Sequence, residues 1–229
     1  MLILDNAKLK IETFNNNPKY RGREDYCCIL LARGQEKSLV DKDGNISAES
    51  LELLDKVLRG YFRMNRLNAM GNPREFVSKL REKFANRELG SILAKLRDVT
   101  IMSNNLEEYK ADIEKLYESL SNPVDGLSSN NRRFCVGTTK LVHCLYPELF
   151  VMVDSTVGCV VLNLKHGQYN NFSSYWKVLK RCNNELGEWQ RLCGSTDDLL
   201  RLDSGPTTLT RIFDKCCWSL REKDISLCH

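Results

Sequence analysis

A lysine and an aspartate between residues 134 and 157 are the side chains of this chain best placed to do chemistry. Lys140 follows a glycine-containing turn, so we expect it on the first turn of a helix. A partly desolvated amine there can lose its proton and attack the C1′ carbon of a deoxyribose. Asp154 ends the apolar run 149–153, where a poorly solvated carboxylate would stabilise an oxocarbenium-like sugar or take up a proton. The alternative for Asp154, which Ser155 follows, is a helix cap.

The turn before Lys140 has the residue types of a phosphate-binding site. A glycine hairpin that precedes a helix exposes backbone N–H groups at the positive end of the helix dipole. We therefore expect one phosphate to bind to these amides and to the threonine hydroxyls, with two arginines contacting the neighbouring phosphates. Such contacts hold a nucleic acid in register without reading its sequence. The residues concerned are Arg132, Arg133, Val136, Gly137, Thr138 and Thr139.

Amphipathic patterns predict helices along almost the whole chain and hence an all-α fold. The segment 47–66 carries apolar residues at three- and four-residue spacing. At 72–84, Asn72 and Pro73 have the residue types of a helix cap and of the first helical position. Further helices are expected at 88–101, 105–120, 138–146, 151–164, 172–192 and 207–220.

Two features of the chain suggest how these elements are organised. Short apolar runs in the first 45 residues are compatible with a small strand pair, and 41–44 has the composition of a turn. The loop 121–131, rich in Asn, Ser, Gly and Pro, separates two different halves. We therefore expect an N-terminal helical lobe over 1–125, with basic helices, and a second helical lobe over 126–229 that carries the candidate site.

Composition excludes several classes of protein. The 229 residues are 42% hydrophobic and 28% charged, as in ordinary globular proteins. The longest apolar runs are far shorter than a bilayer requires, and the first residues lack the pattern of a secretory signal, so we expect a cytoplasmic protein. The ten cysteines include no C-x2-C pair, and three histidines are available as co-ligands. We expect mostly buried thiols, no metal and no cofactor.

The net charge of +4 is unevenly distributed. Between residues 56 and 97, eleven basic residues oppose three acidic ones. Four of them, Lys56, Arg59, Arg63 and Arg66, recur at helical spacing opposite the apolar stripe and would form a cationic edge suited to a polyanion. The alternative is an ordinary solvated helix face.

These motifs resemble the helix-hairpin-helix DNA glycosylase superfamily, in particular its archaeal 8-oxoguanine glycosylase branch. The resemblance covers roughly residues 130–220 and lies in the Val-Gly-Thr-x-Lys segment, the apolar return that ends in Val-Asp, and the segment 210–218. The centre of the chain is more closely similar to a group of uncharacterised prokaryotic proteins with Lys-x-Leu-His, Pro-Glu-Leu-Phe and Asp-Ser motifs. At the first of these motifs the chain has Lys-Leu-Val-His, at 140–143. It also departs from the superfamily in having Cys135 at a hairpin glycine position and a shorter interval between Lys140 and Asp154.

The resemblance implies an all-helical, two-lobed fold with a cleft. Lys140 would be the Schiff-base nucleophile, Asp154 its acidic partner, and the turn 135–139 the DNA anchor. A damaged base would be flipped out of duplex DNA into the cleft. The expected function is a DNA glycosylase, with or without β-lyase activity, that excises an oxidised or otherwise damaged base. The alternative is a non-catalytic member of the same fold that binds nucleic acid or a partner protein.

Overall fold

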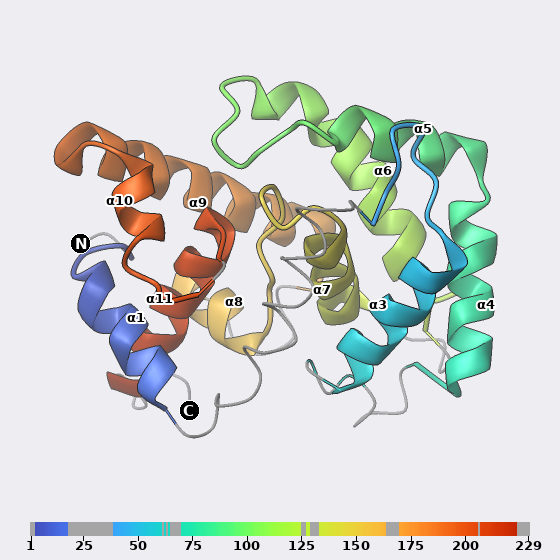
Figure 1. Ribbon diagram of the computed structural model, residues 1–229, viewed down its shortest axis with the longest axis horizontal. Coiled ribbons are helices and arrows are strands. Elements are labelled where there is room, and N and C mark those ends of the chain that lie inside the picture. The colour runs from blue at the N-terminus through green and yellow to red at the C-terminus, as the bar shows by residue number, and fades with distance from the viewer. Residues whose placement is uncertain are drawn as a thin grey trace.

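The protein is all-helical in the part of the chain that the structure describes (Figure 1). An isolated antiparallel bridge pairs Val40 with Ile46 and closes the turn expected at 41–44. In that turn Gly44 has a φ of 83°, and the Asp41 carboxylate accepts two backbone N–H groups at 2.8 and 2.9 Å. The computed structural model describes residues 3–17, 39–60, 62, 64, 70–124, 127–128, 133–163, 170–205 and 207–223, with side chains as far as 220.

One group of helices comes from the middle of the chain. It comprises α3 (Ala48–Gly60), α4 (Pro73–Phe84), α5 (Arg87–Leu96), the short 3-10 helix η2 (Leu106–Tyr109), α6 (Lys110–Ser121) and α7 (Cys135–Leu145). The start of α4 is the one expected, because the Asn72 side chain accepts the Glu75 N–H at 2.9 Å and Pro73 occupies the first helical position. Helix α7 packs against α3 and α6.

A second group joins the two ends of the chain. It comprises α1 (Ala7–Asn16), α8 (Ser155–Leu162), α9 (Phe172–Cys193), α10 (Thr196–Leu200) and α11 (Leu209–Lys223). Helix α11 packs against both α1 and α8, and Figure 1 shows the blue first helix beside the red last one. The helices therefore do not group at the expected boundary of residue 125: α1 joins the C-terminal helices, and α7 joins the N-terminal ones.

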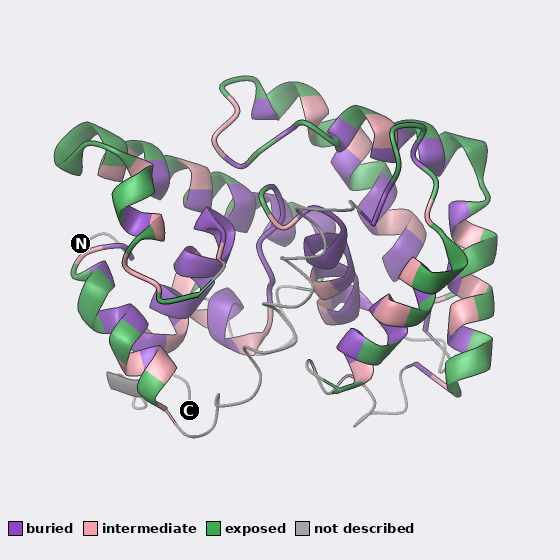
Figure 2. Cartoon of the chain, in the orientation of Figure 1, coloured by how far each residue is buried: buried purple, intermediate pink, exposed green. Residues whose placement is uncertain are grey.

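Helix α7 lies at the side of the first group that faces the second, and it is buried on most of its surface (Figure 2). The chain leaves α7 through an irregular segment, 146–154, which is held in place from other elements. The Tyr146 hydroxyl donates to the Leu93 carbonyl at 2.7 Å, and the Ile101 N–H donates to the Glu148 carbonyl at 2.9 Å. A single continuous core runs through both groups.

Candidate active site

The turn expected at 135–139 is part of a helix. Helix α7 begins at Cys135, three residues before the expected start, and Gly137 lies in its first turn. A methyl group at Gly137 would overlap the ring of Phe134, so glycine is required here for close packing. Thr138 is fully buried and Thr139 is 2% exposed, so neither hydroxyl faces solvent. The hairpin prediction is wrong because apolar packing around Phe134 extends the helix towards its N-terminus.

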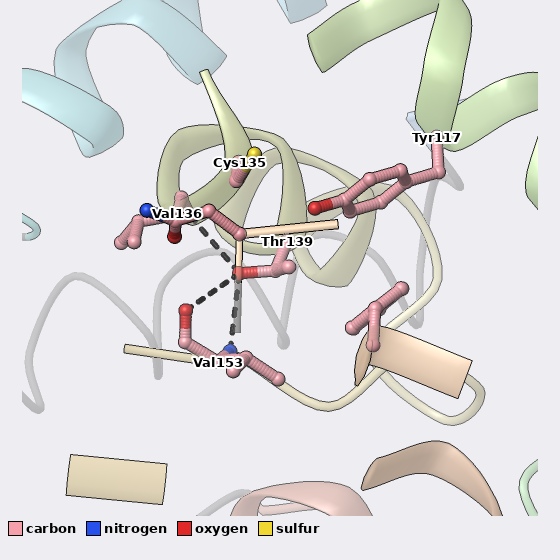
Figure 3. Close-up of a pocket in the computed structure, with 7 residues that line it drawn as sticks. Tyr117, Cys135, Val136, Thr139 and Val153 are labelled. Carbon is pink, nitrogen blue, oxygen red and sulfur yellow. Dashed lines mark hydrogen bonds between the residues drawn. The ribbon is translucent and has the colours of Figure 1, made fainter. Parts of the chain in front are cut away.

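Thr139 joins α7 to the irregular segment before α8. Its hydroxyl oxygen accepts the Val153 N–H at 3.0 Å and lies 3.0 Å from the Val136 carbonyl and 3.2 Å from the Val153 carbonyl (Figure 3). Lys140 directly follows Thr139 in the chain, and Asp154 directly follows Val153. A buried side-chain bond thus brings together the two segments that carry the candidate lysine and aspartate.

The Lys140 side chain is partly buried among apolar groups. Its amine lies 3.7 Å from the sulfur of Met64 and 5.3 Å from the centroid of the Phe62 ring. Such surroundings replace part of the water that an ammonium group otherwise binds. They fit the expectation of a partly desolvated amine, although Lys140 lies in the second turn of α7 instead of the first.

Asp154 is the N-cap of α8. One oxygen, Oδ1, accepts the N–H groups of Thr156 at 2.9 Å and Val157 at 3.2 Å. The helix therefore begins at Ser155 and not at residue 151, and 151–153 lie outside any helix. Both interpretations of Asp154 remain compatible with this geometry, because the cap uses a single carboxylate oxygen.

A second acid near this site was not singled out from the sequence. Asp214, on α11, is 2% exposed and forms an ion pair with Arg211, one turn earlier. Burial raises the pKa of Asp214 to about 6; the Arg211 guanidinium lowers it, the charge of Asp154 raises it and that of Lys140 lowers it. The sequence indicated this ion pair only through the three-residue spacing of Arg211 and Asp214, a spacing that is common on helices.

The expected DNA contacts divide into three cases. Arg132 lies outside the described residues. Arg133 is exposed, but its guanidinium donates to both oxygens of the Glu118 carboxylate, at 2.9 and 3.1 Å. These hydrogen bonds raise the pKa of Arg133. The backbone and side chains of 136–139 belong to the buried helix α7, so they do not form an exposed phosphate-binding loop.

The expected cationic edge of α3 is interrupted. Arg59 turns inward, where it pairs with Asp55 at 2.7 Å and donates to the carbonyls of Met70 and Gly71. Lys56 is exposed, and Arg63 and Arg66 lie outside the described residues. At Arg59, therefore, structural hydrogen bonding replaces the phosphate contact that the helical spacing suggested.

A small pocket lies on the other side of the Thr139 bond. It is too narrow for a water molecule, and Figure 3 shows Tyr117, Cys135 and Thr139 around it. Neither Lys140 nor Asp154 is among the residues that line it. The ring of Tyr117 stacks on that of Tyr175, with centroids 5.2 Å apart. This pocket is therefore distinct from the candidate pair of Lys140 and Asp154.

Comparisons of the chain with protein-family models, with curated proteins and with solved structures give no match. The resemblance to glycosylases consequently depends on the residues themselves. Within the described ranges, no group of His, Cys, Asp and Glu side chains is arranged to hold a metal ion. None of the helices described is both long enough and apolar enough to span a bilayer.

Proposed function

We propose that the protein is a DNA glycosylase that removes an oxidised or otherwise damaged base through Lys140. The observation that carries this proposal is the hydrogen bonding between Thr139 and Val153, which brings the segment of the partly buried Lys140 amine beside the segment of the Asp154 carboxylate. Lys140 comes from the central helix group, whereas Asp154 and Asp214 come from the terminal one. A nucleophile and an acid on opposite sides of such a junction can act on one substrate atom held between the groups.

The reaction requires a neutral amine. The Lys140 nitrogen would form a bond to C1′ of the damaged nucleotide, and the bond from C1′ to the base nitrogen would break, with its electron pair leaving on the base, which then takes up a proton. The sugar carbon carries positive charge as that bond breaks, and the Asp154 carboxylate would stabilise it. Opening of the sugar ring then gives the Schiff base. No cofactor is needed for these steps.

The alternative function is binding of nucleic acid or a partner protein without catalysis. One observation favours it: the residues expected to grip a phosphate, 136–139, lie in a buried helix. In that case Lys140 would serve packing through Phe62 and Met64.

Borohydride trapping on two DNA duplexes tests the proposal. One duplex carries 8-oxoguanine, and the other carries an abasic site, whose aldehyde forms a Schiff base without prior removal of a base. Hydride adds to the carbon of the C=N bond and links the protein to DNA. We expect a covalent complex with the abasic duplex that Lys140→Ala abolishes.

The matched control is Lys110→Ala, because the Lys110 amine also lies over an aromatic ring, 6.0 Å from the centroid of Trp176. This variant should trap as well as the wild type does. Salt-sensitive DNA binding with no trapping would favour the non-catalytic alternative. Trapping that survives Lys140→Ala would reject Lys140 as the nucleophile.

A further inference from the structure

A thioether sulfur contacts the candidate nucleophile. The Lys140 amine donates to the Sδ atom of Met64 at 3.7 Å, and the same amine lies 5.3 Å from the centroid of the Phe62 ring. Met64 and Phe62 follow the end of α3 in the chain, and α3 packs against α7, the helix that carries Lys140. Because a thioether is a weak hydrogen-bond acceptor, this contact stabilises a charged amine only slightly. A stronger acceptor at the same position would act on Lys140 directly.

Met64 is also accessible from solvent. Among the methionines that the structure describes, Met64 and Met102 are partly exposed, whereas Met70 and Met152 are 1% and 4% exposed. An oxidant dissolved in water therefore reaches the first two side chains more readily than the buried ones. Met64 thus combines two properties, because its side chain is open to small oxidants and its sulfur lies against the amine of Lys140.

Hydrogen peroxide oxidises a thioether to a sulfoxide. The sulfur donates a lone pair to one peroxide oxygen, the O–O bond breaks, and the other oxygen leaves as hydroxide, which becomes water when it takes up a proton. The sulfur loses two electrons, the peroxide gains two, and the methionine gains one oxygen atom. This oxygen would be bonded to an atom that already contacts the Lys140 amine, so it comes within reach of an ammonium N–H. Hydrogen bonds from an ionised donor are roughly twice as strong as neutral ones.

We propose that Met64 is an oxidation switch for Lys140: hydrogen peroxide converts its thioether to a sulfoxide, and the new oxygen holds Lys140 as the ammonium, which cannot attack a sugar carbon. A thiol-dependent sulfoxide reductase reverses the change, because the oxygen leaves as water while two thiols are oxidised to a disulfide. The loss of reactivity rests on the proposed function, whereas the contact between the sulfoxide and the amine does not.

Oxidation of the full-length protein followed by NMR tests the switch without DNA. After treatment with hydrogen peroxide, peptide mass mapping should find oxygen added to Met64 and Met102 before Met70 and Met152. The protein carries ¹³C at the Cε atoms of its lysines, and the Lys140 signal is assigned by its absence from Lys140→Arg. We expect oxidation to move the titration of the Lys140 amine to higher pH by roughly half a unit or more.

Met64→Leu and Met102→Leu are the matched pair of variants, because leucine keeps the approximate volume of methionine and lacks the sulfur. The shift should remain in oxidised Met102→Leu and be absent from oxidised Met64→Leu. Met64→Gln needs no oxidant, since its amide oxygen is a stronger acceptor than sulfur, and the untreated variant should show the shift. Resistance of Met64 to peroxide, loss of the fold on its oxidation, or an unchanged Lys140 titration in the oxidised wild type would each overturn the inference. An unchanged titration in folded Met64→Gln would do the same.

Borohydride trapping on the abasic duplex separates this inference from the proposed function. If both are right, oxidation slows trapping near pH 7 by roughly threefold or more in the wild type and in Met102→Leu, but not in Met64→Leu. If the Lys140 titration moves but the untreated protein does not trap the duplex, the glycosylase proposal fails and the switch stands. If the untreated protein traps the duplex and oxidation changes neither the titration nor the rate, the proposed function stands and this inference fails.

Discussion

His143 lies three residues beyond Lys140 on α7 and is 3% exposed. Its Nδ1 lies 2.7 Å from the Phe150 carbonyl oxygen, which can only accept, so the neutral ring donates Nδ1–H. Burial lowers the pKa of His143 to about 4. The ring therefore stays uncharged at neutral pH and fastens α7 to the segment that leads to Asp154.

The buried ring makes stability depend on pH. Because the pKa of His143 is lower in the folded state than in the unfolded state, its contribution is fully present above about pH 6.5 and is lost as the pH falls towards 4. Relative to His143→Asn, whose amide can supply the same N–H, the wild type should lose about 2 kcal/mol of unfolding free energy between about pH 7.5 and about pH 5. Urea unfolding at several pH values measures this.

Comparison with the variant is needed because Asp214 acts in the opposite direction. Its pKa is raised on folding, so its contribution increases as the pH falls through about 6. A difference between wild type and His143→Asn that does not change with pH would show that the ring is not held neutral by the fold.

Helix α8 shows how one residue can serve both an element and a site. The Asp154 carboxylate satisfies the N–H groups of Thr156 and Val157, which have no partner inside the helix. Asparagine caps a helix about as well as aspartate but carries no charge. Substitution can therefore separate the structural role of Asp154 from the chemical one.

We expect the free energy of unfolding of Asp154→Asn to lie within about 0.5 kcal/mol of the wild-type value. That of Asp154→Ala should be lower by about 1 kcal/mol. If the carboxylate stabilises the sugar cation, both variants should excise a damaged base far more slowly than the wild type. Thermal unfolding and single-turnover excision assays measure the two effects. Full excision by Asp154→Asn would leave this residue as a cap only.

Helix α7 depends on a glycine for packing. Gly137 lies under the ring of Phe134, which is 3% exposed and contacts Phe76 edge-on at 6.0 Å between centroids. Because the ring has little room to move, Gly137→Ala should destabilise the protein by about 1–3 kcal/mol.

Gly187→Ala, in α9, provides the control, since a methyl group there meets no other atom within 4 Å. This substitution should be neutral or should stabilise by up to about 1 kcal/mol, because alanine favours helix formation. Chemical denaturation of both variants measures the contrast. Equal stabilities of the two variants would argue against close packing at Phe134.

At the scale of the whole molecule, the first helix, α1, is bonded to the last helix, α11. The Lys215 amine, on α11, donates to Asn15 of α1 at 2.9 Å and to Asp203 at 2.7 Å, and the Ser219 hydroxyl donates to the Lys10 carbonyl. The Lys215 and Asp203 side chains are 2% and 5% exposed. Helix α1 thus holds α11, which also packs against α8, the helix that Asp154 caps.

Lys215→Met should destabilise the protein by about 3–5 kcal/mol, because Asp203 is left buried without its cation. Adding Asp203→Asn removes the uncompensated charge, so the double variant should recover part of this loss. Thermal unfolding of the single and double variants measures the recovery. A double variant as unstable as the sum of the single ones would show that the pair is not coupled.

The sequence by itself determined the helical class and several helix starts, because amphipathic spacing and capping side chains act over one or two turns of a single segment. Asn72 and Pro73 are examples, and a cap was the alternative to the chemical role of Asp154 on the same grounds. Tertiary structure decided the start of α7, which depends on the packing of Phe134, and the pairing of α1 with α11. It also decided the burial of Asp214, since a carboxylate's burial and charged neighbours depend on residues far away in the chain, and no local pattern carries that information.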